Sequence, residues 1–129
     1  MQSTSTKAQV MNLQTHEQFE MMWNPSIEQQ KPNYPILLNF SASWCGPCKR
    51  VDWNMICEEF PTLQIYKCDI DENSYTPGFC GVKSIPSFAI LKGPKQIVGP
   101  EQMSDTAKIC SWIFGAISKI LAAFAKDFV

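Results

Sequence analysis

The stretch Trp44-Cys45-Gly46-Pro47-Cys48-Lys49 decides the fold and the chemistry that this sequence predicts. It follows the apolar run Ile36-Leu37-Leu38-Asn39-Phe40, which is typical of a strand, and it leads into residues 49–60. In that segment apolar residues recur at one-turn spacing and predict a helix. The apolar stripe of this helix consists of Val51, Met55, Ile56 and Phe60.

The position of two cysteines at the start of a helix has chemical consequences. Unpaired N–H groups and a partial positive charge at a helix N-terminus stabilise a thiolate, which lowers the thiol pKa. Two intervening residues bring the second sulfur within disulfide distance of the first, and Pro47 stands at a first-turn position that tolerates proline. The segment therefore predicts a redox-active pair, Cys45 and Cys48.

Composition excludes several other classes of protein. The chain has 129 residues, of which 45% are hydrophobic and 18% charged, as is typical of one globular domain. A formal net charge of −1 argues against a nucleic-acid-binding protein, which needs a basic surface. Because we find no run of about eighteen apolar residues, we expect no membrane span.

The first residues bear on localisation. Residues 1–7 are polar and lack the apolar core of a secretory signal. They are rich in Ser and Thr and free of acidic residues, like an organelle transit peptide, but they contain no arginine. We therefore expect a flexible leader over residues 1–7 and a cytoplasmic protein. Its six cysteines are then mostly reduced, and any disulfide is catalytic.

The rest of the chain alternates strand and helix patterns. Thr15 and Gln18 form a capping box at the start of a helix that ends at Trp23. Ser104 is the expected cap of a long final helix. The expected strands are residues 10–13, 36–42, 63–69, 87–92 and 96–98, with a short helix over 76–81. This order predicts the α/β class: a three-layer α/β/α sandwich with a mixed central sheet, formed by residues 8–129 as one domain.

The full string Trp44-Cys45-Gly46-Pro47-Cys48-Lys49 behind a strand, with Ile85-Pro86 further along the chain, resembles the thioredoxin family. The resemblance runs from about Val10 into the final helix. It implies the thioredoxin fold and a thiol–disulfide oxidoreductase that reduces disulfides in other proteins. It also implies a separate electron donor, an NADPH-dependent thioredoxin reductase. Because the chain has no glycine-rich nucleotide loop, we expect it to bind no nicotinamide cofactor itself.

The two motif cysteines have different expected roles. As a thiolate, Cys45 attacks a protein disulfide and forms a mixed disulfide, which Cys48 then resolves. The alternative is a zinc site, which usually needs two ligand pairs. The remaining cysteines form no second close pair, so we expect no metal; they are Cys57, Cys68, Cys80 and Cys110.

These four remaining cysteines are expected to act as small apolar residues. Cys80 lies shortly before Ile85-Pro86, where some thioredoxins carry extra regulatory cysteines. A regulatory role for Cys80 therefore stays open as well.

The resemblance also implies a substrate surface around the pair. Pro86 matches the family's cis-proline, a minority state of X-Pro bonds. The backbone of Ile85 would then pair with an extended substrate segment. An apolar rim for the substrate is implied at Trp44, Gly46, Pro47, Ile85 and Gly99.

Two residues depart from the family pattern and are expected to tune the site. Many members carry a buried aspartate where this chain has Asn39, and that carboxylate helps to deprotonate the second cysteine. An amide accepts no proton at neutral pH, so Lys67, which matches the usual lysine partner, would lack its counter-charge. Trp53 replaces a proline that often kinks the helix, so we expect a straighter helix.

Two alternatives to a general reductant remain. One is a specialised thioredoxin-like protein that serves a single partner or peroxidase. The other is an interaction module with little redox turnover. The final helix also continues about ten residues past the family's usual end, through Ile120-Leu121-Ala122-Ala123-Phe124. Because large apolar patches are uncommon on monomers, we expect the body of the protein or a partner to cover this end.

Overall fold

The computed structural model describes residues 7–26 and 32–126, and its elements follow the predicted order. Along the chain they are β1 (Val10–Asn12), α1 (His16–Trp23), β2 (Ile36–Ser41), the short 3-10 helix η1 (Pro47–Arg50), α2 (Trp53–Glu59), β3 (Gln64–Asp69), α3 (Tyr75–Phe79), β4 (Ser87–Gly93), β5 (Gln96–Gln102) and α4 (Thr106–Lys126).

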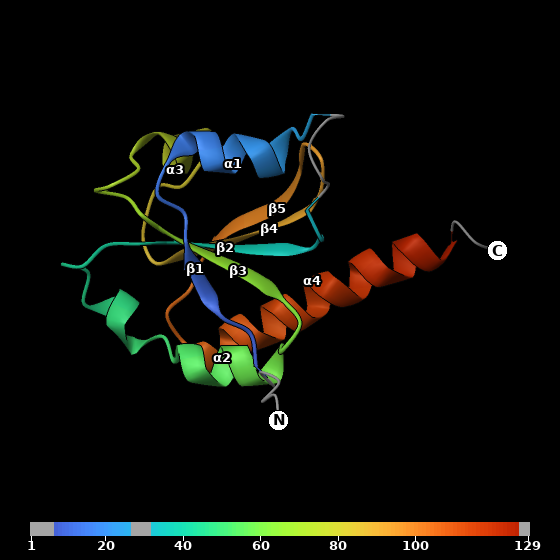
Figure 1. Cartoon of the computed structure of the whole chain (residues 1–129). Helices are drawn as coiled ribbons and strands as arrows, with labels where there is room; N and C mark the ends of the chain where they lie inside the picture. The colour runs from blue at the N-terminus through green and yellow to red at the C-terminus, as the bar shows by residue number, and fades with distance from the viewer. Residues whose placement is uncertain (1–6, 27–31, 127–129) are drawn as a thin grey trace, which may run out of the picture.

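The five strands form one sheet in the order β1-β3-β2-β4-β5. Strands β1, β3 and β2 are parallel, whereas β4 pairs antiparallel with both β2 and β5. In Figure 1, α1 and α3 cover one face of the sheet, and α2 and α4 cover the other. The predicted three-layer sandwich with a mixed sheet is therefore confirmed, and β5 forms its antiparallel edge.

Strand β2 lies at the centre of the sheet, and all six of its residues are buried. Side chains alternate between the two faces along a strand. Leu37 packs into the cluster that α2 and α4 complete, whereas Leu38 packs into the cluster beneath α1. Asn39 and Ser41 share the face of Leu37, so they point toward α2 and the segment that carries the cysteines.

The helix predicted over residues 49–60 is interrupted, and that prediction is wrong. Val51 is extended, with φ −68° and ψ 121°, and α2 begins only at Trp53. The cause is local: the Asp52 side chain accepts a hydrogen bond from Met55 N–H at 3.1 Å, and Asp52 N–H donates to Thr106 Oγ1 at 3.0 Å. An aspartate cap thus breaks the helix just before Trp53, so the expectation of a straighter helix is also wrong. Met55, expected in the buried stripe, is 47% exposed.

The predicted end of β5 and the predicted cap of α4 also differ from the structure. Strand β5 continues to Gln102 instead of ending at residue 98, and it passes through a cis Gly99-Pro100 bond. Helix α4 is capped by Asp105 and not by Ser104, because Lys108 N–H donates to Asp105 Oδ1 at 3.1 Å. The predicted capping box of α1, by contrast, is present.

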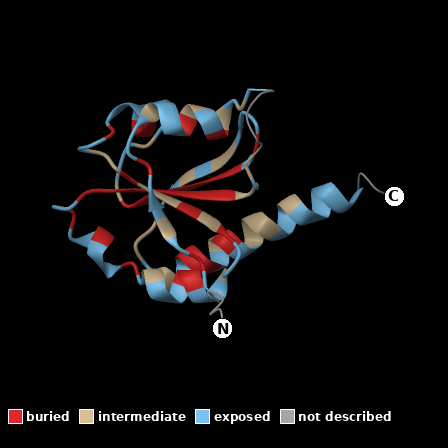
Figure 2. Cartoon of the chain, in the orientation of Figure 1, coloured by how far each residue is buried: buried red, intermediate tan, exposed pale blue. Residues whose placement is uncertain are grey.

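Helix α4 has two halves with different surroundings. Ile109, Cys110 and Ile113 are buried in the core cluster on the α2 side of the sheet. The described residues from Leu121 onward are all exposed, and this half projects beyond the sheet (Figures 1 and 2). Ile120 still packs against the core, but the body does not cover residues 121–126; cover of these residues by a partner stays a prediction.

Helix α4 also meets the length and apolarity of a membrane span, which the sequence analysis did not expect. It has 21 residues and a mean hydropathy of 1.5 over its most apolar window, and 22% of that window is buried. The comparison of α4 with a membrane span rests only on the length and the composition of the helix. The first half of α4 completes the core of the sandwich.

The start of the described chain is attached to α2. Lys7 Nζ donates a hydrogen bond to Asn54 Oδ1 at 2.8 Å, and Ala8 N–H donates to the Cys57 carbonyl at 3.0 Å. The other residues of the expected leader, 1–6, lie outside the described residues.

Candidate functional site

Cys45 and Cys48 form a disulfide at the end of β2, with their Cα atoms 5.3 Å apart. Both are buried, and Ile70 and Ile85 pack against them. The Cys48 N–H donates a hydrogen bond to Cys45 Sγ at 3.2 Å. In the reduced protein this bond stabilises a Cys45 thiolate. The helix η1 has only four residues and is separate from α2, so no long helix dipole acts on the sulfurs. The Cys48 N–H supplies the stabilisation of the thiolate that was expected from that dipole.

The loop before β4 lies against the cysteine pair. The Ile85-Pro86 bond is cis, as the resemblance implied, and Pro86 is buried. Within the described residues, the backbone of Ile85 takes part in no backbone hydrogen bond, whereas Pro86 O accepts one from Met103 N–H at 3.2 Å. The geometry therefore leaves Ile85 able to pair with an extended peptide beside the sulfurs.

The other side of the pair presents an exposed surface. Gly46 and Pro47 are exposed, and Trp44 has an exposed fraction of 65%. The Trp44 Nε1–H donates to Asp71 Oδ2 at 2.8 Å, which fixes the indole above the loop. Sequence reasoning did not single out Asp71. The signal was present, because Asp71 lies just past the end of β3, at the same edge of the sheet as the cysteines.

The prediction that Gly99 belongs to this rim does not agree with its position. Gly99 lies within β5 with φ +92°, and a Cβ there would come 2.8 Å from the Phe88 carbonyl oxygen. Its role is thus to allow close approach of β4 and β5. The segment after β5, at Met103, is the one that contacts Pro86.

Asn39 is 1% exposed and is bound to the sheet itself. Its Nδ2 donates a hydrogen bond to the Ser87 carbonyl at 3.3 Å. In the sheet register Asn39 lies between Lys67 on β3 and Phe88 on β4. The register thus places Asn39 beside Lys67, but the amide does not line the cavity described next.

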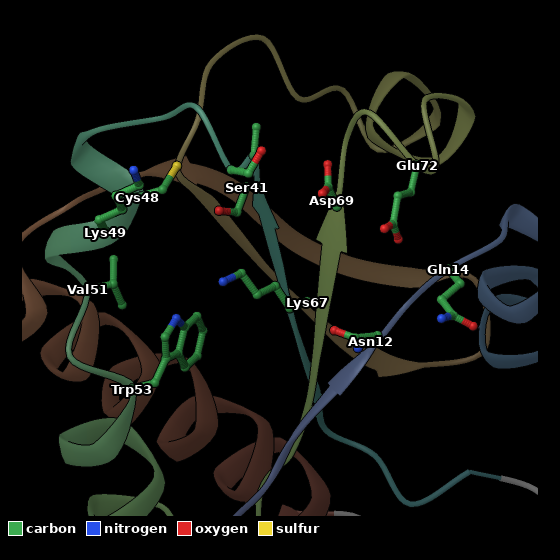
Figure 3. Close-up of a pocket in the computed structure, with 12 residues that line it drawn as sticks. Asn12, Gln14, Ser41, Cys48, Lys49, Val51, Trp53, Lys67, Asp69 and Glu72 are labelled. Carbon is green, nitrogen blue, oxygen red and sulfur yellow. The ribbon is translucent and has the colours of Figure 1, made fainter.

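A cavity of about 620 Å³ opens beside Cys48, on the α2 side of the sheet. Trp53 and Val51 form one wall, and the ends of β2 and β3 form the other (Figure 3). Its polar lining comes from Asn12, Gln14, Ser41, Ser43, Lys49, Lys67, Asp69 and Glu72. The second cysteine thus borders a polar space that contains two carboxylates.

Burial raises the pKa of each remaining thiol. It raises the pKa of Cys68 and Cys80 to about 12 and that of Cys110 to about 11, and it also raises the pKa of Cys57. A hydrogen bond with Glu59 adds to the effect on the Cys110 pKa. Thiols of this kind hold little thiolate at neutral pH. These values agree with packing roles and argue against a reactive regulatory thiol at Cys80.

Sequence comparison shows which known proteins this chain is similar to. A family model described as Thioredoxin matches residues 10–114. A chloroplastic thioredoxin M2 from Arabidopsis thaliana is 36% identical over 95 residues, which cover 71% of this chain and 46% of that protein. A thioredoxin from Listeria monocytogenes is 42% identical over 72 residues, which cover 52% of this chain and 68% of that protein. The chain thus spans less than half the length of the Arabidopsis relative.

A solved structure shows the same architecture over most of the chain. The crystal structure of thioredoxin from Trypanosoma brucei brucei is similar, with a TM-score of 0.70 and 26% sequence identity. The superposition covers 92% of this chain and 97% of that one.

Proposed function

This chain belongs to the thioredoxin family of thiol–disulfide oxidoreductases, and we propose that it reduces disulfides in other proteins. The observation that carries the proposal is the Cys45–Cys48 disulfide beside the cis Ile85-Pro86 loop. The sulfurs supply two electrons, and the Ile85 backbone supplies sequence-tolerant recognition of an extended substrate segment. The exposed face of Trp44 adds apolar contact area beside them.

The proposed cycle has two thiol exchanges. The Cys45 thiolate attacks one sulfur of a substrate disulfide; a bond forms between Cys45 and that sulfur, and the other substrate sulfur leaves as a thiolate and takes up a proton. Cys48, once deprotonated, attacks Cys45 Sγ, and the second substrate sulfur leaves with the electron pair. The substrate gains two electrons and two protons, and the Cys45–Cys48 disulfide forms.

The reductant that restores the dithiol is proposed to be an NADPH-dependent thioredoxin reductase. We place the protein in the cytoplasm, where such a system keeps thiols reduced. The Arabidopsis relative is chloroplastic, so family members also work elsewhere.

A turnover assay tests the proposal. A generic protein disulfide such as insulin is offered with NADPH and a thioredoxin reductase, or with glutathione as the alternative reductant. Rapid reduction in the presence of the reductase, and slow reduction with glutathione, is the expected result. Absence of turnover with both would overturn the general reductant.

The second candidate is a specialised protein that serves a single partner or peroxidase. It is favoured by the exposed apolar end of α4, where Leu121 is 58% exposed and Phe124 is 61% exposed. In that case insulin would be reduced slowly with either reductant, while one partner protein would be reduced rapidly.

A further inference from the structure

Resolution of the mixed disulfide requires the Cys48 thiol to lose a proton. Cys48 is only 7% exposed, and burial disfavours the charged form of a thiol. Asn39, at the position of the family's carboxylate, accepts no proton and uses its amide to bind the Ser87 carbonyl. The proton must therefore go elsewhere, and the cavity beside Cys48 shows where.

Only two carboxylates line that cavity within the described residues, Asp69 and Glu72. The cations that line it are Lys49, from η1, and Lys67, from β3. In Figure 3, Ser41 lies between Cys48 and Asp69, and Glu72 lies further from the sulfur. The cavity volume of about 620 Å³ holds water, and its polar lining supplies partners for it.

The register of the sheet explains how Asp69 comes to face this space. Asn39 lies beside Lys67, and two residues further along the same face Ser41 lies beside Asp69. That second pair is nearer to the end of β2 that leads into the cysteine loop. This chain thus carries a carboxylate on β3, one step along the ladder from the pair that Asn39 forms with Lys67.

We propose that Asp69 accepts the Cys48 proton through water in this cavity, beside Ser41. This inference rests on the proposed Cys45/Cys48 cycle. In the mixed disulfide the proton passes from Cys48 Sγ through water to the Asp69 carboxylate. The Cys48 thiolate then forms the bond to Cys45 Sγ, the bond between Cys45 and the substrate sulfur breaks, and the departing substrate thiolate takes up a proton from the cavity.

The surroundings favour Asp69 over Glu72. Asp69 is half-buried at the end of a strand, where Oδ1 accepts a hydrogen bond from Asp71 N–H at 2.9 Å, so its orientation is fixed. Lys67 stands two residues earlier on the same face of β3 and lines the same cavity. Glu72 lies in the loop after β3 and is exposed. Glu72 is therefore a matched control, because it is an acidic residue like Asp69 and lines the same cavity.

The test follows single turnover of the reduced protein with hydroxyethyl disulfide. Samples are quenched with acid at successive times, and mass spectrometry separates the reduced, mixed-disulfide and oxidised forms. This gives the rate of attack by Cys45 and the rate of resolution by Cys48 separately. We expect Asp69→Asn to slow resolution by about tenfold, less than the ~10²–10⁴-fold of a fully positioned base because water also reaches the cavity. The attack rate should change by less than about twofold.

Two further variants separate proton transfer from a structural effect. Glu72→Gln should leave both rates within about twofold of the wild type. Asn39→Asp, added to Asp69→Asn, should restore most of the resolution rate, because it returns a carboxylate to the same face of the sheet. The dependence of the resolution rate on pH should also differ between Asp69→Asn and the wild type, because the variant lacks the carboxylate that accepts the proton.

Several results would overturn the inference. They are an unchanged resolution rate in Asp69→Asn, an equal loss in Glu72→Gln, or an equal slowing of attack and resolution. Asp69→Asn could also resolve more slowly while its pH profile is unaltered and the double variant shows no recovery. That result would assign the slower rate to a structural effect, and it would overturn the inference as well. The assay needs no reductase, so failure of the proposed function, seen as absence of turnover with insulin, is a distinct result.

Discussion

The two ends of this molecule are built in opposite ways. At the cysteine end, Cys45 and Cys48 are buried and hydrogen-bonded, and they lie against the cis-proline loop. At the other end, the last turns of α4 extend beyond the sheet and are exposed (Figure 2). Among their apolar residues, Leu121 is 58% exposed. Many independent contacts thus specify the first region, and few contacts constrain the second.

This difference shows where the chain's stability and chemistry reside. The core half of α4, with Ile109 and Ile113 fully buried, belongs with the cysteine end, because both complete the same side of the sheet. The outer half adds apolar surface that the fold itself does not use. Substitutions at the two ends should therefore have very different consequences.

The largest effect is expected from the cysteine pair itself. Cys45→Ser should abolish attack on disulfides, because the serine hydroxyl is no substitute for a thiolate. Cys48→Ser should retain the attack and accumulate mixed disulfides, which are visible as new bands on a non-reducing gel. If Cys45→Ser traps partner proteins and Cys48→Ser does not, the roles of the two cysteines are reversed.

The reactivity of thiols should differ sharply between Cys45 and Cys110, the thiol carried by α4. Burial, with a contribution from Glu59, raises the pKa of Cys110 to about 11, so only about 0.1% is thiolate at pH 8. In the reduced protein, alkylation at pH 8 should modify Cys45 first and Cys110 at least about 100-fold more slowly. Mass spectrometry of peptides over time measures both rates.

The same pKa shift has a consequence for stability. A thiol whose pKa is raised from 9.0 to about 11 on folding stabilises the native state below pH 9, and that contribution is lost as the pH rises from about 9 to about 11. In the alkylation experiment, equal rates for Cys45 and Cys110 would contradict the burial that raises the pKa of the Cys110 thiol.

The core half of α4 should be sensitive to truncation of a single side chain. Ile113 is fully buried, so Ile113→Ala should lower the free energy of unfolding by about 2–5 kcal/mol and the melting temperature by about 10 °C. Leu121→Ala, on the exposed half of the same helix, is the matched control and should change it by less than about 0.5 kcal/mol. Equal losses in the two variants would remove the distinction between the halves.

The sequence predicted the cysteine end well because its signals are local. The strand, the Cys45/Cys48 spacing and Pro86 each depend on short-range geometry that residue type alone restricts. The break at Asp52 was missed because it depends on a hydrogen bond to Thr106, far along the chain. Helical periodicity over residues 49–60 could not reveal that contact.

Other features were missed because they arise from the register of strands and the docking of helices. The contact of His16 Nδ1 with Thr76 Oγ1 at 2.9 Å, for example, depends on how α1 packs against α3. The pairing of Ser41 with Asp69, on which the proton-transfer proposal depends, needs the β2–β3 register. Gly99 lies inside β5, against Phe88, because this strand continues to Gln102 and not only to residue 98 as predicted.

The smallest effect is expected from removal of the exposed end of α4. Deletion after Ile120 removes the exposed residues 121–126 together with 127–129, which lie outside the described residues, so we expect it to forfeit little buried apolar area. The melting temperature should change by less than about 2 °C, and the Cys45/Cys48 cycle should proceed at the wild-type rate. Sedimentation of the full chain and the shortened chain, over a range of concentrations, measures association in parallel.

Two outcomes of that deletion would revise the comparison. A fall of about 5 °C or more in the melting temperature, with both proteins monomeric, would show that the body covers this end in solution. Association of the full chain that the deletion abolishes would show that a second copy covers it, as expected for an exposed apolar patch on a helix face. Leu121→Ala, which leaves the length of α4 intact, then distinguishes side-chain contacts from helix length: if contacts are responsible, it reproduces the effect in part.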